Sequence, residues 1–404
     1  MDEATGLGRR VRELRCWRRL TLREAAGLAG LSFSFWGQVE RGEKPVATRR
    51  TLEAMAEALR VHPAELTGQP WTPQDPAGAD MGATLMGIET ALERYELGTD
   101  PGLTVRDWPQ IQADLDRLVT ITHATSDHAS MGELASVLLG ELHGRYLRRP
   151  QQRREVLLAL MMAYTSAVWS AKRLGDRGLP ILAARAVQQC AETLEDPVWL
   201  GYAAWLRDNA TGQLDRAAHY QRSVGAAQTL TSKLGSSDAV QACGMLHLSA
   251  ALAAGAQADH DSVATHLNEA SALADRMDTE VGTWANLWFG PTNVGIWRTS
   301  VAVEIGEHGK ALEAAKTVHP ELLPGHVRQA EFWADVGRAL VAGKKTRDKG
   351  VRVLLHAEEL APQRIRHDLL VREVVAGLLR QARRDAGGRE LRRLAWRMGI
   401  APVG

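Results

Sequence analysis

The chain has 404 residues, a formal net charge of +1 and 45% hydrophobic residues. This length suits about two or three domains with buried cores, and the near-neutral charge excludes a uniformly basic protein. Cys16, Cys190 and Cys243 lie far apart without metal-ligand spacing, so we expect reduced thiols and no metal site. The first residues lack the basic and apolar regions of a signal peptide, which favours a cytoplasmic protein.

Arginine is concentrated near the N-terminus. Between Arg9 and Arg23 there are seven arginines and a single acidic residue, Glu13. An arginine-rich helix can simply be a solvated face. Because this one directly precedes a pair of short helices, we expect its arginines to face phosphates.

The segment Leu20–Gly42 predicts two short helices joined by a tight turn. Thr21 can cap the first helix, and Gly30 can end it in a left-handed conformation. The small side chains of Ala25 and Ala26 allow the second helix to approach closely. Ser32 caps that second helix, which ends near Gly42. Two helices arranged in this way can place the second in a DNA major groove.

These residues, and above all the run Gln38-Val39-Glu40-Arg41-Gly42, resemble the lambda-repressor-like (Xre/Cro) helix-turn-helix family. The likeness continues through Pro45, the helix Thr51–Leu59 and Pro63–Leu66, and covers roughly a sixth of the chain. It implies a DNA-binding domain over residues 1–67. The sequence departs from the family at Leu22, where glutamine is common, and in the bulk of Phe33 and Trp36.

The resemblance implies that the helix beginning at Ser32 enters the major groove, where a glutamine can match the exposed edge of adenine. The residues expected to contact bases are Ser32, Phe33, Ser34, Gly37 and Gln38. Those expected to contact phosphates are Thr21, Arg23, Arg41, Lys44, Arg49 and Arg50. We expect the core to contain Val11, Leu14, Leu20, Leu31, Val39 and Leu52, and Glu40 to pair with Arg41. One such domain makes a small interface, which favours a homodimer on an inverted repeat.

Three prolines, Pro70, Pro73 and Pro76, predict a linker over residues 68–82. Beyond it the periodicity is helical without strand-like alternation, so the fold class is all-α. We expect connecting helices over 83–150 and a helical-repeat sensor and dimerisation domain over 151–404. Glycines 175, 212, 255, 306 and 343 recur 37, 43, 51 and 37 residues apart. This spacing resembles a longer, degenerate form of tetratricopeptide repeats, giving an α-solenoid. The alternative is an irregular helical bundle.

Two apolar stretches are candidate membrane spans. Val156–Ala171 is short, and Ala239–Ala258 is interrupted by polar residues. Both are more typical of buried helices, so we expect no membrane partner.

The run Thr283–Trp297 gathers aromatic and amide side chains around Pro291, which should kink or break a helix. Asn286, Asn293 and Trp297 would share one face if the helix were continuous. Tryptophans with amide neighbours suit a peptide backbone or a polar small molecule. The candidate ligand-binding residues are Trp284, Asn286, Trp288, Asn293, Trp297, Gln329 and Trp333. Alternatively, the tryptophans fill a wide core and Asn293 re-caps the helix.

The run Phe289–Val294 followed by alanine-rich helices resembles actinobacterial-type regulators that join an Xre head to a repeat-bearing body. The layout is also similar to peptide-responsive quorum-sensing regulators. This resemblance implies a transcriptional regulator whose binding to double-stranded DNA is modulated by a peptide or small molecule. The alternatives are a DNA-bound adaptor that recruits a protein, and a repeat scaffold that does not bind DNA. The sequence shows no phosphate loop, zinc motif or nucleophile elbow, so we expect no catalytic residues, no enzyme activity and no cofactor.

Overall fold

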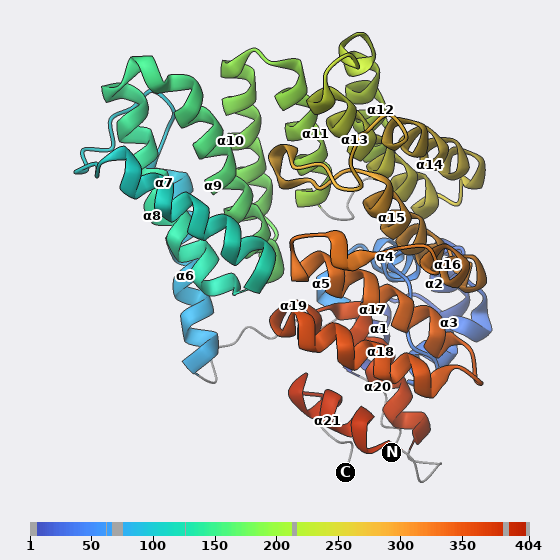
Figure 1. Cartoon of the computed structure of the whole chain (residues 1–404). Coiled ribbons are helices and arrows are strands. Elements are labelled where there is room, and N and C mark those ends of the chain that lie inside the picture. Colours follow the sequence, from blue (N-terminus) through green and yellow to red (C-terminus); the bar gives the residue numbers. More distant parts are fainter. Residues whose placement is uncertain are drawn as a thin grey trace.

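The computed structural model describes residues 6–61, 63–66, 76–125, 127–211, 216–382 and 388–400. Every secondary-structure element within these ranges is a helix, so the fold is all-α, as predicted. A small N-terminal head (residues 6–66) is followed by a long helical array (Figure 1). The larger part of the expected linker, residues 68–75, lies outside the described residues. Its remaining part, residues 76–82, belongs to the first helix of the array.

The head consists of five helices: α1 (Gly6–Trp17), α2 (Leu22–Leu28), α3 (Phe33–Glu40), α4 (Arg49–Ala58) and α5 (Pro63–Leu66). Both predicted caps are present. The Thr21 hydroxyl accepts from the backbone N–H of Glu24, and the Ser32 hydroxyl accepts from that of Phe35. Gly30 adopts the left-handed conformation, with φ of 62°. These local signals fix the turn between α2 and α3.

The core of the head contains the residues that the sequence predicted. Val11, Val39 and Leu52 are buried, and Leu14, Leu20 and Leu31 pack against them. Trp36 is fully buried, so its bulk fills the core. The predicted pairing of Glu40 with Arg41 is wrong: Glu40 pairs with Arg15, and Arg41 pairs with Glu43. The α3 backbone directs Glu40 inward toward α1, whereas Arg41 follows the last helical residue and lies exposed.

The array comprises long helices joined mostly by short turns. Its α-helices are α6 (Pro76–Arg94), α7 (Trp108–Thr120), α8 (His128–Arg148), α9 (Arg153–Arg173), α10 (Leu179–Leu194), α11 (Pro197–Thr211), α12 (Arg216–Leu230), α13 (Ser237–Ala256), α14 (His260–Ala274), α15 (Pro291–Glu304), α16 (His308–Ala315), α17 (His326–Ala342), α18 (Arg347–Leu360), α19 (Pro362–Arg366), α20 (Leu369–Ala382) and α21 (Arg389–Arg397). A π-helical turn follows α7 at Ile121–Thr125.

Successive helices from α8 to α18 pack against one another, which gives a helical repeat-like array. Figure 1 shows it curving from α6–α10 through α11–α15 to α17–α21, with the head beside the C-terminal helices. One core cluster runs without a break from Ile88 to Val301, across the boundary expected at residue 150. A second cluster joins α17 to α21. The apolar helix α13, which is long enough to cross a membrane, is mostly buried in the first of these cores.

The chain between α14 and α15 is not helical as a whole. A short 3₁₀ turn, Trp284–Asn286, interrupts it, and Ala285, Asn286 and Trp288 have positive φ. α15 begins at Pro291, which confirms the predicted break. Asn286 therefore lies outside the helix that carries Asn293 and Trp297, and the expectation of a shared helical face is wrong.

Phe289 anchors this irregular segment to the array. Its ring is fully buried and lies directly on the backbone of Gly244 in α13, where any side chain would overlap it. The Gln241 side-chain oxygen accepts from the backbone N–H of Trp284 at 3.1 Å, and Gly282 N–H donates to Phe289 O at 2.7 Å. The segment is therefore held by specific contacts although its backbone is irregular.

Candidate functional site

The first turn of α3 presents an open surface. Ser32, Phe33 and Ser34 are exposed, and 55% of the Phe33 surface is accessible. An apolar ring left in solvent on a helix of this kind is available to a partner surface. Of the five residues expected to contact bases, these three are the most accessible.

Gly37 and Gln38 lie further along α3 and are less open. Gly37 is buried because the Arg41 guanidinium covers it: a Cβ added at Gly37 would lie 3.1 Å from Arg41 Nη1. Arg41 in turn donates two hydrogen bonds to Glu43, at 2.7 and 2.9 Å. Gln38 is half-buried. Arg41 would have to leave Gly37 before a duplex could contact that position.

Most of the residues expected to contact phosphates are exposed, and one faces the array instead. Arg23, Lys44 and Arg50 are exposed, and Lys44 lies 5.2 Å from the centre of the Phe35 ring. Thr21 is exposed, but its hydroxyl also bonds Glu24 in a capping box. Arg49 differs from the others because it faces the array.

A buried triad supports α3 from behind. Arg15 donates from Nε and Nη2 to the two Glu40 oxygens at 2.6 and 2.9 Å, and Trp36 Nε1 donates to Glu40 Oε1 at 2.7 Å. The hydrogen bond to Glu40 raises the pKa of Arg15. Arg10 and Arg18 also donate to backbone carbonyls of the head. Three arginines of the N-terminal cluster therefore make bonds within the head, although Arg10 and Arg18 remain exposed.

The head is docked on the array through its other side. Glu53 of α4 accepts two hydrogen bonds from Arg216 of α12, at 2.6 and 3.1 Å. Arg177, which follows α9, contacts Glu65 at 2.8 Å. Both pairs join acidic residues of the head to arginines of the array.

The α3–α4 loop makes a second group of docking contacts. Glu304 of α15 accepts from the backbone N–H of Arg49 at 2.8 Å and from Arg338 of α17 at 2.9 Å. Arg338 also donates to Ala47 O at 2.7 Å. Burial alone would raise the pKa of Glu304, but Arg338 and Arg49 hold that pKa below its usual value. A charged carboxylate therefore fixes the start of α4 to the array.

Three adjoining cavities line the inner side of the array. The largest, of about 690 Å³, has aromatic walls that include Trp108, Trp199, Tyr202 and Trp205. A cavity of about 260 Å³ lies between array and head, and a third of about 210 Å³ adjoins both. Trp169 borders all three. The largest falls within the usual range for small-molecule sites.

The residues that the sequence analysis proposed for ligand binding are divided by the structure. Four of them line these cavities: Asn286, Trp288, Asn293 and Trp297. The others, all within the described residues, line none of the three: Trp284, Gln329 and Trp333. Trp284 packs on Trp199 and Tyr202 behind the aromatic wall.

Asn293 has internal partners for its amide. It donates to Leu287 O at 3.1 Å and accepts from Arg328 at 3.2 Å. These bonds tie the irregular segment to α15 and α17. Asn293 does not re-cap α15, because the N-cap position is Gly290 and no side chain caps it. Gln329 likewise donates to Leu323 O at 2.7 Å.

Sequence reasoning missed the cavity residues of α9 and α11. Trp199, Tyr202 and Trp205 recur every three residues, a spacing that puts aromatic rings on one side of α11. Trp169, Lys172 and Arg173 at the end of α9 look like an ordinary helix terminus. The aromatic period was a usable signal, whereas the α9 residues gain meaning only through the distant helices they face.

Comparison with known proteins agrees with this geometry at the N-terminus. Residues 6–67 match the family model of a helix-turn-helix domain. No curated protein and no solved structure matches the chain. Within the described ranges, no group of three His, Cys, Asp or Glu residues is placed to hold a metal ion. The head is a helix-turn-helix domain, which points to a DNA-binding regulator.

Proposed function

We propose that the protein is a sequence-specific transcriptional regulator of the cytoplasm, whose head binds double-stranded DNA under the control of the array. The exposed first turn of α3 is the observation that carries this proposal. The docking contacts use Ala47, Arg49, Glu53 and Glu65, and leave Ser32–Ser34 open. A duplex could therefore reach α3 while the head remains docked.

The chemistry of the exposed residues suits such a surface. Ser32, Ser34 and Gln38 offer groups that can hydrogen-bond base edges, and Phe33 can pack on a thymine methyl group. Arg23, Arg41, Lys44 and Arg50 would contact phosphates and orient the head without reading sequence. We remove Arg49 from this second group because its side chain faces the array.

We further propose that the regulator acts as a homodimer on an inverted repeat. A single head buries a small area, and two heads one helical turn apart supply the affinity that specific binding requires. The array, in this view a degenerate tetratricopeptide-like solenoid, would supply the dimer contact and hold a peptide or small-molecule effector, as in quorum sensing. The three cavities support an effector site.

Selection of duplexes from a random library, followed by fluorescence anisotropy on the selected site, tests the proposal. Ser34→Glu places a negative charge on the exposed turn of α3 and should weaken binding at least 10-fold. Gln189→Glu makes the same change of charge on an exposed position of α10 and should leave binding unaltered. Equal binding by both variants would contradict the proposed surface, and a wild-type protein that ignores duplexes at low salt would favour the scaffold alternative.

A further inference from the structure

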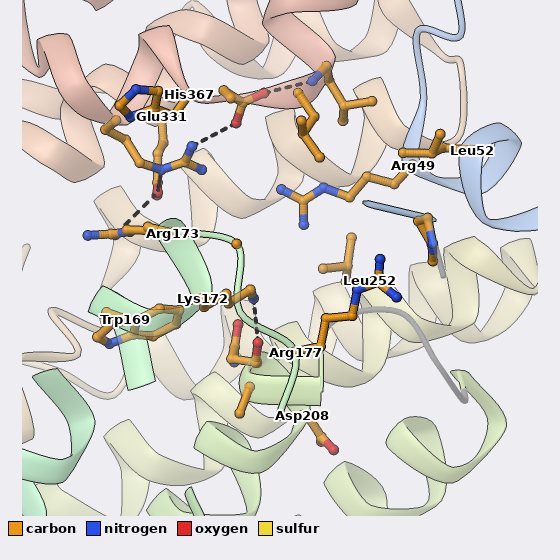
Figure 2. Close-up of a pocket in the computed structure, with 18 of the residues that line it drawn as sticks. Arg49, Leu52, Trp169, Lys172, Arg173, Arg177, Asp208, Leu252, Glu331 and His367 are labelled. Atoms are coloured by element: carbon orange, nitrogen blue, oxygen red, sulfur yellow. Dashed lines mark hydrogen bonds and ion pairs between the residues drawn. The ribbon is translucent and has the colours of Figure 1, made fainter. Parts of the chain in front are cut away.

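The cavity between head and array is lined by an unusual number of cations. They come from α4, from the α9 end and the turn that follows it, and from α12 and α19: Arg49, Lys172, Arg173, Arg177, Arg216 and Arg364. Figure 2 shows Arg49 reaching in from the head, opposite Lys172 and Arg173. Gathering so many like charges around one space is unfavourable unless something negative balances them.

The acidic residues of the cavity are already engaged. Asp368 accepts from Arg364 at 2.8 Å and from two backbone N–H groups. Asp208 is bonded to Ser223 and Arg222, and Asp176 accepts from the backbone N–H groups of Gly178 and Leu179. Glu331 accepts from Arg364 at 2.8 Å and is 3.9 Å from Arg173. Of the cavity cations, these carboxylates hydrogen-bond Arg364, whereas Arg177 and Arg216 pair with Glu65 and Glu53 of the head.

Arg49, Lys172 and Arg173 form the under-neutralised centre. Arg49 Nε is 3.7 Å from Glu304, which is long for a hydrogen bond, and Lys172 donates to a neutral carbonyl, Asn209 O. Arg173 Nη1 is buried and has no hydrogen-bond partner among the described residues. Burial, reinforced by the neighbouring arginines, lowers the pKa of Lys172 to about 7 and that of Arg173 to about 10. Both groups are thus held in surroundings that disfavour their charge.

A buried histidine adds further open donors or acceptors. His128, at the start of α8, lines the same cavity and is only 1% exposed. Neither of its ring nitrogens has a partner within the described part of the chain. Unsatisfied buried groups of this kind are rare in native structures, so these nitrogens can hydrogen-bond a molecule that enters the cavity.

The cationic cavity and the aromatic cavity of about 690 Å³ share Trp169 in their walls. The Lys172 and Arg173 cations each lie 5.5 Å from the Trp169 ring. The cavity of about 210 Å³ adjoins both, since it is lined by Lys172 and Arg173 and also by Trp205 of the aromatic wall. A ligand with an anionic group among the cations could therefore extend an apolar ring system toward Trp199, Tyr202 and Trp205.

We propose that this junction is the effector site, and that its ligand is a small organic anion with an apolar ring system, its carboxylate or phosphate bridging Arg49 of the head to Lys172 and Arg173 of the array. The regulatory role of this ligand rests on the proposed function, whereas binding of the ligand does not. Arg49 is the first residue of α4, so an anion held there contacts both parts of the molecule. A ligand that favours one arrangement of head and array changes the affinity of the protein for DNA. Because the coupling is reciprocal, DNA changes the affinity of the protein for the ligand by the same factor.

The test uses 2-naphthoate and 2-naphthyl phosphate as probes and the neutral 2-naphthamide as a matched control. Full-length protein is titrated with each, and binding is followed by tryptophan fluorescence and calorimetry. At least one anion should bind 10-fold or more tightly than the amide. Arg49→Gln and Lys172→Gln should each weaken that anion 10-fold or more, whereas Arg50→Gln, the exposed neighbour on α4, should not. Thermal unfolding and circular dichroism confirm that each variant is folded.

The outcomes separate the two anionic groups and the two proposals. Preference for naphthoate or for naphthyl phosphate identifies the anionic group. Equal binding of anions and amide, equal affinity of the Arg49 and Arg50 variants, or no binding of either anion would overturn the inference. Duplex binding is measured on the same preparations: DNA binding without anion binding sinks only this inference, and anion binding without DNA binding sinks only the proposed function.

Discussion

Arg15 and Glu40 form a bidentate ion pair across the head, with N–O distances of 2.6 and 2.9 Å, although they are 25 residues apart in sequence. Their side chains are 12% and 6% exposed, and the Trp36 indole donates to the same carboxylate. The pair connects α1 to the last turn of α3. It therefore fixes the orientation of α3 relative to α1, and with it the position of the exposed first turn of α3.

Glu40→Gln should destabilise the head, because it leaves the Arg15 guanidinium buried without a counter-charge. Breaking a buried pair on one side costs about 3–5 kcal/mol. Chemical denaturation followed by tryptophan fluorescence measures the loss. Glu43→Gln is the control, since it breaks the exposed pair with Arg41, and exposed pairs contribute about 0–1 kcal/mol. A similar decrease in the free energy of unfolding in both variants would contradict a larger contribution from the buried Arg15–Glu40 pair.

Gln38→Ala and Arg23→Ala should affect DNA binding in different ways. The first should relax base preference at one position of each half-site, at a cost of roughly 1–3 kcal/mol on the selected duplex only. The second should weaken selected and random duplexes alike and reduce the salt dependence by about one unit of slope. Anisotropy titrations at several salt concentrations measure both. The assignment of roles fails if the two variants behave identically on selected and random DNA.

Gly244→Ala should displace the irregular segment from α13, because the added methyl group overlaps the buried Phe289 ring. Overpacking of this kind typically costs about 1–3 kcal/mol, measured by thermal or chemical unfolding. Gly225→Ala in α12 is the matched control, since its position is exposed and has open space. There the helix propensity of alanine should stabilise the protein by up to about 1 kcal/mol. Opposite signs are expected, and equal signs would contradict the packing described for Phe289.

Lys172→Met should raise the melting temperature at pH 6.5, and the gain should shrink toward pH 9.5. The pKa of Lys172 is about 7 in the fold, below its usual value of about 10.4, so the charged amine opposes folding fully below pH 7. That opposition fades as pH rises between these two values. The cations that face the amine are Arg49, Arg173, Arg216 and Arg364. Arg173, whose pKa is about 10, begins to lose its charge only at the upper end of this range.

Lys310→Met provides the control for this pH profile. Lys310 is 76% exposed on α16 and pairs with Glu307 at the surface. Its replacement should change the melting temperature little, and by a similar amount at both pH values. An increase in melting temperature for Lys172→Met that does not vary with pH would contradict a pKa near 7 for the Lys172 amine.

Local features of the fold could be predicted from the sequence because they depend on neighbouring residues. The caps Thr21 and Ser32, the left-handed Gly30 and the helix break at Pro291 were all read correctly. Apolar periodicity identified the core of the head and the helical nature of the array. Such signals repeat over one or two turns and need no knowledge of distant contacts.

The site depends on contacts that sequence spacing does not encode. Arg49 meets Glu304 across 255 residues, so a residue typical of a phosphate contact turned out to face the array. The partner of Glu40 was misjudged because adjacency in the chain favoured Arg41. Lys172 and Arg173 form part of a cationic cluster only after α4, α12 and α19 converge on them. Whether Ser32, Phe33, Ser34 and Gln38 touch bases stays a prediction.

The bond between Glu304 and the start of α4 has a consequence for how the molecule can move. Lifting the head off would break two hydrogen bonds at once, the one from Arg49 N–H to Glu304 and the one from Arg338 to Ala47 O. Hydrogen bonds weaken steeply with distance, so both are lost at a small displacement, before the gap is wide enough for water to replace them. Intermediate tilts therefore lose the docking contacts without gaining hydration of the groups that made them. Transmission between the two ends of this chain should accordingly behave as a latch with two positions, and not as a hinge with a continuum of angles.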